Sequence, residues 1–378
     1  TYTEPTIVSS GELKLGGLGA PSATRQLAVG NIVTVQAGAT LIVSGLTGSN
    51  DNNEILGGLQ GDGTVTTDNA ATIARLTVQN TANYTFSGQI TGNERLLLIK
   101  SGTGTFTLSG NNSYNGTTTV LQGILRIASP TALGSVMGGT TVASGAAIDF
   151  NGITYQNLEP LSIAGTGVSS SGVLYNSSVT PALFPGAITV TAASTISTTN
   201  QITLSGTISA AAQNLTKTGI GTLVFTSNSV SVFNFSIAAG TLNAGSSTIT
   251  IYGAFTNSGA FLPNASTVIF RGSVSQTIPG VSFYNCTIQN FDGVVLGGDI
   301  AINGILTLTE GICNTGVYII DLGTSGTLVE TPINPISYVT GTIKVTRNLL
   351  TGVPNTFGNI GVEITENNVN NNSTEVYR

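Results

Sequence analysis

One stretch of this chain occurs twice, and that repetition limits what the chain can fold into. Residues 100–128 read KSGTGTFTLSGNNSYNGTTTVLQGILRIA, and residues 217–245 read KTGIGTLVFTSNSVSVFNFSIAAGTLNAG. At this offset of 117 residues the matching positions are Gly102 with Gly219, Gly104 with Gly221, Thr105 with Thr222, Asn111 with Asn228, Gly123 with Gly240 and Leu125 with Leu242. Self-similarity at a fixed spacing is typical of repeat architectures, in which each repeat is one structural unit.

Short alternating segments indicate that these units are made of β-strands. Segments such as 32–35 (IVTV) and 40–43 (TLIV) are short runs of β-branched and apolar residues, and a glycine follows each of them within three residues. The segment 93–100 (NERLLLIK) is the best helix candidate, but it aligns with strand-like text in the second copy. Hydrophobic residues make up 40% of the chain, which is enough to bury a core. The sequence therefore predicts an all-β fold.

The arrangement of these strands is predicted to be a right-handed parallel β-helix. A sandwich or a barrel could also be built from short strands, but neither requires a repeat of constant length. The 49 glycines supply corners at which a strand bends into the next face. Coils of about 20 to 27 residues, stacked at ~4.8 Å, would fill residues 1–330, with the first residues capping the open end.

Two regions depart from this regular alternation of short strands and glycine turns. Residues 160–185 contain several prolines, including Pro181 and Pro185, and we expect this segment to loop out of or bulge the solenoid. Near residue 330 prolines and charges become more frequent, so residues 331–378 are predicted to begin a second β module that continues beyond Arg378. The predicted domains are therefore 1–330 and 331–378.

The net charge of the chain limits the classes of partner that it can bind. The 11 basic and 17 acidic residues give a net charge of −6, which argues against nucleic acid and against a basic patch for anionic lipid. No apolar run approaches the ~20 residues of a membrane-spanning helix, and no signal peptide opens the sequence. We therefore expect no membrane insertion of this segment, which begins at a mature terminus or inside a longer protein.

The repeat resembles a known family. The text LLIKSGTGTFTLSGNNSYNGTTTVLQGILRI is similar to the passenger-associated repeat of autotransporter proteins, and the second copy resembles it more loosely. Later text, such as INGILTLTEGICNTG and YVTGTIKVTRN, looks like large secreted β-solenoid proteins of Bacteroidetes. Such proteins are commonly type IX secretion cargo, and some are adhesins of gliding cells. The resemblance implies an extracellular or cell-surface location, with secretion and surface-anchoring machinery as partners.

Catalytic chemistry has few candidates in this sequence. With no histidine, Ser-His-Asp and Cys-His nucleophiles and histidine-based zinc hydrolase motifs are excluded. A polysaccharide lyase or hydrolase built on a β-helix needs clustered carboxylates, and Asp292, Asp299 and Asp321 are the runner-up candidates. The wider set of carboxylates considered is Asp149, Glu159, Asp292, Asp299, Glu310 and Asp321. Sparse acids beside glycine are usually turn residues, so no catalytic residue and no cofactor is predicted.

Metal and thiol chemistry is equally sparse. Asp51, Asn53 and Glu54 lie in an oxygen-rich run that could hold Ca²⁺, but a solvated turn is favoured because the spacing of a calcium loop is missing. Cys286 and Cys313 lie 27 positions apart. They could stack on neighbouring coils and form a disulfide, although a pair of buried apolar side chains is the favoured interpretation.

The aromatic residues of the second half are interpreted as an internal stack in preference to a sugar-binding platform. They are Tyr252, Phe255, Phe261, Phe270, Phe283, Tyr284 and Phe291. The favoured function is a non-enzymatic, surface-exposed or secreted segment of an adhesin-like bacterial protein that presents loops on a rigid scaffold, with glycans or surfaces as further possible partners. The alternatives are a polysaccharide-degrading enzyme and a structural filament or secretion cargo without a ligand of its own.

Overall fold

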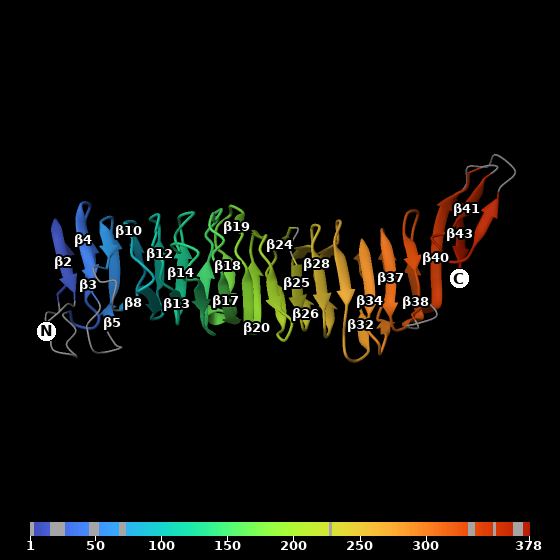
Figure 1. Cartoon of the computed structure of the whole chain (residues 1–378), viewed down its shortest axis with the longest axis horizontal. Helices are drawn as coiled ribbons and strands as arrows, with labels where there is room; N and C mark the ends of the chain where they lie inside the picture. The colour runs from blue at the N-terminus through green and yellow to red at the C-terminus, as the bar shows by residue number, and fades with distance from the viewer. Residues whose placement is uncertain are drawn as a thin grey trace. The chain divides into compact units, whose positions relative to one another are not determined.

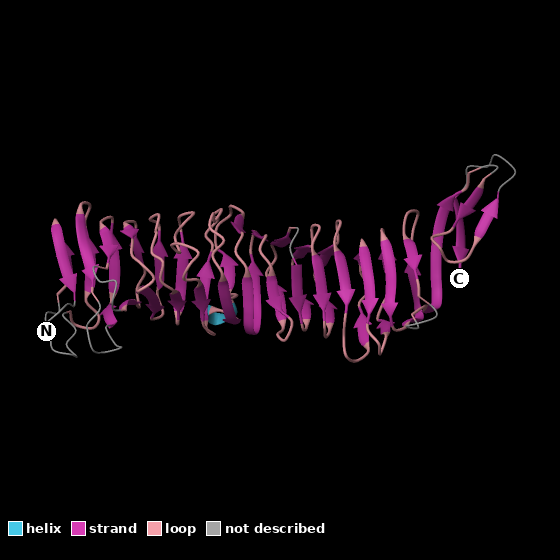
Figure 2. Cartoon of the chain, in the orientation of Figure 1, coloured by secondary structure: helices cyan, strands magenta, loops and turns pink. Residues whose placement is uncertain are grey.

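The computed structural model describes residues 4–15, 27–44, 53–67, 73–226, 229–331, 337–350, 353–365 and 373–378. Over these ranges the chain is built from β-strands, with one 3₁₀ turn, η1 (Val168–Ser170), and no α-helix (Figures 1 and 2). The chain divides into two compact units. Unit 1 comprises residues 1–206 and 218–221, and unit 2 comprises residues 207–217 and 222–378.

Unit 1 is a solenoid of parallel strands. In chain order its strands are β1 (Thr6–Val8), β2 (Gly11–Leu15), β3 (Ile32–Val35), β4 (Ala39–Val43), β5 (Asn53–Leu56), β6 (Gly58–Gly61), β7 (Thr64–Thr66), β8 (Ala74–Gln79), β9 (Tyr84–Phe86), β10 (Gln89–Ile90), β11 (Leu96–Ser101), β12 (Thr105–Leu108), β13 (Thr118–Val120), β14 (Gly123–Ile127), β15 (Thr140–Val142), β16 (Ala146–Asp149), β17 (Leu161–Gly165), β18 (Leu174–Asn176), β19 (Ala182–Phe184), β20 (Ile188–Thr198) and β21 (Gln201–Leu204). One face stacks β1, β3, β6, β9, β12, β14, β16 and β18. A second face stacks β5, β8, β11, β13, β15 and β17, and a third stacks β2, β4, β7 and β10.

Unit 2 repeats this arrangement with its own strands. They are β22 (Ile208–Ala210), β23 (Leu215–Thr218), β24 (Thr222–Phe225), β25 (Ser229–Val232), β26 (Phe235–Ile237), β27 (Thr241–Asn243), β28 (Thr248–Ile251), β29 (Phe255–Asn257), β30 (Ala260–Leu262), β31 (Thr267–Phe270), β32 (Gln276–Ile278), β33 (Ser282–Phe283), β34 (Asn285–Gln289), β35 (Val294–Leu296), β36 (Ile300–Ile302), β37 (Ile305–Glu310), β38 (Cys313–Asp321), β39 (Thr327–Val329), β40 (Val339–Asn348), β41 (Pro354–Thr356), β42 (Glu363–Thr365) and β43 (Ser373–Tyr377). The longest face stacks β22, β25, β28, β31, β34, β37 and β39 in parallel.

The coils differ in length. Thr6 pairs with Val33, whereas Thr267 pairs with Asn285, so the coil in unit 1 is half as long again as the coil in unit 2. Most strands keep their in-register pairing while the turns between them take up the difference; the register shifts within the pairs β17–β20, β34–β37 and β38–β40. The predicted all-β fold of parallel, stacked coils is confirmed, and the autotransporter-like repeat lies within it.

The core of unit 2 follows from the alternation of its strands. In β31 and β34 every second side chain is buried, because successive side chains of a strand point to opposite faces. The inward positions stack on their register partners from coil to coil. A chain of phenylalanine rings reinforces this core: Phe225, Phe235, Phe255, Phe261, Phe270 and Phe283 lie with neighbouring ring centroids 5.8 to 6.4 Å apart.

A lysine is buried at the same position of each copy of the repeat. In unit 1 the Lys100 ammonium donates hydrogen bonds to the carbonyls of Ser101, Gly102 and Gln122, at 2.7 to 3.1 Å. In unit 2 the Lys217 ammonium donates to the carbonyl of Ala239, 3.0 Å away, which is the repeat counterpart of Gln122. Burial lowers the pKa of each lysine to about 8. The repeat thus encodes a buried cation that binds one coil to the next.

The Gly-x-Gly pairs of the repeat form corners, the role that the sequence predicts for glycine in this chain. Gly102 and Gly219 have φ of 84° and 75°, in the left-handed region that favours glycine. A Cβ on Gly104 would lie 2.2 Å from the carbonyl oxygen of Ala82 on the preceding coil. The corner therefore needs glycine both for its backbone conformation and for the close approach of the neighbouring coil.

Of the two outcomes predicted for the proline-containing segment, a bulge occurs and a projecting loop does not: the register of β17 against β20 shifts between Ile163 and Gly165. Residues 160–185 contribute β17, β18 and β19 to the coils, and the side chain of Phe184 is fully buried. Pro181 and Pro185 flank β19, where a missing N–H interrupts no ladder hydrogen bond. The expectation of a loop was wrong because it treated proline at the end of a strand like proline within one.

The C-terminal strands change the direction of pairing. β38 pairs in parallel with β40, whereas β40 pairs antiparallel with β43, and β41 pairs antiparallel with β42. The rise in proline and charged residues near residue 330 therefore coincides with the first antiparallel strand pairs among the described residues. The domain boundary at residue 330 stays a prediction, as does a continuation beyond Arg378.

The two cysteines behave as small apolar residues. Both thiols are buried and free, and burial raises the pKa of each. Cys286 stacks between Val268 and Leu306 on the longest face, whereas Cys313 pairs with Val294 on another face. The stacking that a disulfide required does not occur, because the coils here are shorter than the separation of the two cysteines along the chain.

Candidate functional site

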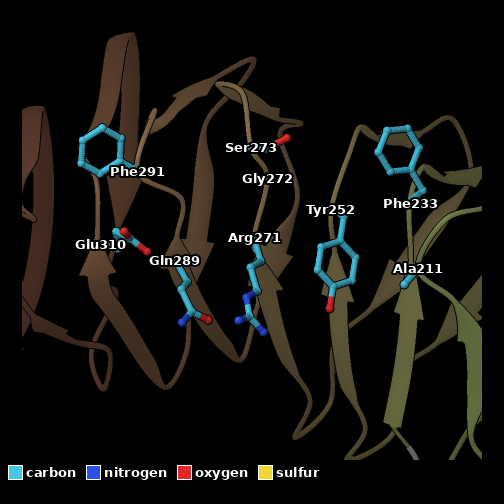
Figure 3. Close-up of a pocket in the computed structure, with 9 residues that line it drawn as sticks. All are labelled: Ala211, Phe233, Tyr252, Arg271, Gly272, Ser273, Gln289, Phe291 and Glu310. Atoms are coloured by element: carbon cyan, nitrogen blue, oxygen red, sulfur yellow. The ribbon is translucent and has the colours of Figure 1, made fainter.

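Unit 2 carries a groove that runs across the ends of six neighbouring strands, β22, β25, β28, β31, β34 and β37. Its volume is about 700 Å³, and it is lined by Ala211, Phe233, Tyr252, Arg271, Gly272, Ser273, Gln289, Phe291 and Glu310 (Figure 3). The pairing of Val232 with Ile251 and of Ile251 with Phe270 brings the next residues, Phe233, Tyr252 and Arg271, into line. Each coil therefore adds one side chain to the groove, about 4.8 Å from the last.

The same register extends the row beyond the arginine. Phe270 pairs with Ile288, so Arg271 is followed by Gln289 on the next coil. Gln289 pairs with Glu310 across a shift in register between β34 and β37. Figure 3 shows the side chains of Tyr252, Arg271 and Gln289 side by side with their polar ends on the same side.

Two buried amides hold the floor of the groove. The Gln276 side chain accepts a hydrogen bond from the Gly272 N–H at 2.8 Å and donates to the carbonyls of Ile251 and Gly253. The Asn290 amide donates to Gln276 Oε1 at 2.9 Å. Because buried amides that satisfy backbone groups fix the chain locally, the loop that carries Gly272 and Ser273 is held in place.

The groove exposes apolar rings and two charged side chains of opposite sign that do not pair with each other. The side chains of Phe233 and Phe291 are 43% and 79% exposed. Within the described ranges, the Arg271 guanidinium and the Glu310 carboxylate form no hydrogen bond or ion pair with another side chain. Aromatic faces beside free polar groups are the usual lining of a ligand site.

Sequence reasoning missed most of this groove. It interpreted seven aromatic residues as an internal stack, which is correct for Phe255, Phe261, Phe270 and Phe283 but wrong for Tyr252 and Phe291, which line the groove. Tyr284 is 39% exposed and also lies outside the core. The available signal was the equal spacing of Phe233, Tyr252 and Arg271 along the sequence.

None of the three runner-up catalytic carboxylates lines this groove. Asp292 and Asp299 flank opposite ends of β35, and both are exposed. Asp299 Oδ1 accepts a hydrogen bond from the Ile319 N–H, and Asp321 lies 3.8 Å from the Lys344 ammonium. Among the described residues, no hydrogen bond joins any two of the three carboxylates.

Asp149 is a structural acceptor in unit 1. Its carboxylate is fully buried and lies 2.8 Å from the Arg126 Nε. It also accepts hydrogen bonds from the N–H of Asn151 and from the N–H and hydroxyl of Ser177. A carboxylate with this many donors is held in place and is not available to a substrate.

Glu159 is a buried acid with an incomplete set of partners. The Thr140 hydroxyl donates to its Oε1 at 2.8 Å, while Oε2 is buried without a hydrogen-bond partner among the described residues. Burial raises the pKa of Glu159 to about 7, and the hydrogen bond from Thr140 opposes that rise. The buried rings of Tyr114 and Tyr155 lie nearby.

The stability of the chain should depend on the protonation of Glu159. The pKa of Glu159 in the folded chain lies above its ordinary value of 4.5, so the folded state binds the proton more tightly than the unfolded state does. The stability that this proton contributes is therefore fully present below about pH 4.5 and is lost as the pH rises to about 7. A shift of this size corresponds to roughly 3 to 4 kcal/mol. The chain has no histidine to titrate in this window. Urea unfolding of Glu159→Gln at pH 5 and pH 8 should show a smaller difference than the native chain, and an equal difference would contradict the assignment.

The weak calcium candidate is only partly described. Asp51 lies outside the described residues, as does the side chain of Asn53. Glu54 lies within β5 and is 8% exposed, so it is a buried strand residue, not a solvated turn residue as interpreted from the sequence. Within the described part of the chain, no three His, Cys, Asp or Glu side chains gather as a metal site, and no helix is long and apolar enough to cross a membrane.

Comparison with known proteins identifies the repeat. The model of the passenger-associated-transport-repeat matches residues 98–127, which hold β11 to β14 and the buried Lys100. Over 115 residues, or 29% of this chain, the sequence is 37% identical to the adhesin BmaC autotransporter of Brucella suis biovar 1 (strain 1330). The chain spans about 3% of the length of that relative. No solved structure matches. The chain therefore resembles autotransporter passenger β-helices, through a passenger-associated-transport-repeat at residues 98–127.

Proposed function

We propose that this chain is a non-enzymatic segment of a large adhesin-like bacterial protein that is exposed on the cell surface or secreted. The observation that carries the proposal is the passenger-associated-transport-repeat set within stacked parallel coils. The similarity of part of the chain to an autotransporter adhesin supports a location outside the cell.

The construction of the two solenoids suits such a role. The ladders use the backbone hydrogen bonds of each coil, so stability comes from neighbouring contacts and does not need a large globular core. Charged residues number 28 of 378, and threonine, serine and asparagine cover much of the outward surface. The groove of unit 2 is the described surface where exposed aromatic rings and two charged side chains of opposite sign meet.

Display of the chain on a non-adherent bacterium tests the proposed function. We expect the displayed chain to be cleaved by added protease on intact cells and to raise attachment to host cells or glycan-coated surfaces. Export with no gain in attachment would contradict the adhesin role and favour a structural filament or a secretion cargo without a ligand.

A product assay distinguishes an enzymatic role from the proposed non-enzymatic one. The native chain should leave pectin-like and alginate-like polymers uncleaved. Depolymerisation that disappears in Asp292→Ala or Asp299→Ala would contradict the non-enzymatic proposal and support a polysaccharide-degrading enzyme.

The partners in export are proposed to be secretion and surface-anchoring machinery. A translocator of the autotransporter kind and a type IX route with a role in gliding are the two candidates. Export of the chain can be measured in cells that lack one of the two systems. Export should stop only in cells that lack the system on which the chain depends.

A further inference from the structure

The groove of unit 2 has the chemistry of a site for an acidic sugar. Its central residue, Arg271, presents a guanidinium with no ion pair among the described residues, in a chain whose net charge is −6. The planar fork of arginine matches the two oxygens of a carboxylate, which it binds through two parallel hydrogen bonds. An anionic group is therefore the part of a ligand that this residue would orient.

The neighbours of Arg271 suit a sugar ring. Tyr252 lies one coil before it and Gln289 one coil after it, and Figure 3 shows all three polar ends on one side. The hydroxyl and the amide can exchange hydrogen bonds with sugar hydroxyls. The rings of Tyr252 and Phe233 offer flat apolar faces on which the C–H face of a sugar can pack.

The far end of the groove limits how much negative charge a ligand can carry. Glu310 lies two coils beyond Arg271, roughly 10 Å away at ~4.8 Å per coil. A polymer with a carboxylate on every sugar would place one of them against Glu310. A single acidic sugar flanked by neutral sugars avoids this repulsion and still reaches Arg271.

A peptide strand is a poorer fit to the same surface. β28, β31 and β34 are each paired on both sides, so they offer no open edge to which a strand could add. A ligand must be bound through side chains alone, which favours a molecule rich in hydroxyl groups.

We propose that the groove binds an oligosaccharide bearing one carboxylate sugar among neutral sugars. Arg271 binds the carboxylate, Gln289 binds hydroxyl groups, and Tyr252 and Phe233 pack against the sugar rings. This inference rests on the proposed adhesin function and names the class of its ligand.

Titration calorimetry of the soluble chain, residues 1–378, tests the proposal with named probes. Sialyllactose and a glucuronate-capped trisaccharide carry one carboxylate, lactose carries none, and polygalacturonate carries many. We expect a mono-acidic probe to bind about 10- to 100-fold more tightly than lactose, as a charge-assisted bidentate pair predicts. Polygalacturonate should bind more weakly than the mono-acidic probe.

Variants of the arginine assign the binding to the groove. Arg271→Gln should reduce affinity for the acidic probe to that for lactose, and Arg271→Lys should restore only part of it, because lysine is a point charge. Tyr252→Ala should weaken acidic and neutral probes alike. Arg75→Gln, a change outside the groove in unit 1, is the matched control and should bind normally.

Each outcome bears on one of the two proposals. Three results would overturn the proposed ligand class. They are binding of the mono-acidic probe that survives Arg271→Gln, binding of lactose as tight as that of the mono-acidic probe, and binding of polygalacturonate that is tighter than that of the mono-acidic probe. If the displayed chain promotes attachment but no probe binds, the adhesin role stands and the inference about the groove fails. If the probes bind but the displayed chain gives no attachment, the groove is a sugar site and the adhesin role fails.

Discussion

Replacing Phe235 with alanine is expected to lower the free energy of unfolding by about 3 to 5 kcal/mol. The ring of Phe235 is 1% exposed and lies 6.3 Å from the ring of Phe225 and 6.0 Å from that of Phe255. The cavity left by alanine would be hard to close, because ladder hydrogen bonds fix the spacing of the coils on either side. Urea unfolding followed by circular dichroism measures the loss.

Phe233 provides the control close by in the sequence. Its side chain is 43% exposed at the groove, so Phe233→Ala should cost much less stability than Phe235→Ala. Since solenoids need not unfold in one step, hydrogen exchange of the peptides around residues 222–270 should show the same difference locally. Similar losses in the two variants would contradict the assignment of Phe235 to the core.

Replacing Lys100 with methionine is expected to cost about 2 to 4 kcal/mol, because carbonyls of Ser101, Gly102 and Gln122 lose a charged donor. Methionine has a similar length, so the change removes the ammonium without opening a large cavity. Removal of the buried charge offsets part of the cost, since burial already lowers the pKa of Lys100 to about 8. Urea unfolding at pH 7 measures the net loss.

The second copy of the repeat and a surface lysine make this test specific. Lys217→Met should also destabilise the chain, because the Lys217 ammonium donates a hydrogen bond to the carbonyl of Ala239, the counterpart of Gln122. Lys344, which lies at the surface and pairs with Glu375, should tolerate methionine with a smaller loss. A Lys100→Met chain as stable as the native one would show that the buried cation does not hold the coils together.

Much of the fold could be predicted because local chemistry and repetition agree. The short apolar segments predicted strands, the glycines predicted corners, and the strand-like alignment of residues 93–100 is confirmed from Leu96 onward, where β11 begins. The matched lysines were visible in the repeat, but their burial was not. Burial depends on which face of the strand packs inward, and lysine is ordinarily a surface residue.

The groove could not be predicted because it exists only across coils. Its residues come from six turns of the chain, and they align only because short coils pair Ile251 with Phe270 and Phe270 with Ile288. The longer coils expected from the sequence would place Tyr252 and Arg271 out of line. The same error suggested that Cys286 and Cys313 could stack.

The most direct test of the account is a disulfide between neighbouring coils. Thr248 pairs with Thr267, which pairs with Asn285 on the following coil. Paired parallel strands lie ~4.8 Å apart, within reach of a disulfide, whereas two coils span roughly 10 Å. Under oxidising conditions Thr248→Cys with Thr267→Cys should form an intramolecular disulfide seen by peptide mass spectrometry, and Thr248→Cys with Asn285→Cys should not. A bond in the second pair and none in the first would contradict the parallel stacking on which the groove and its proposed ligand depend.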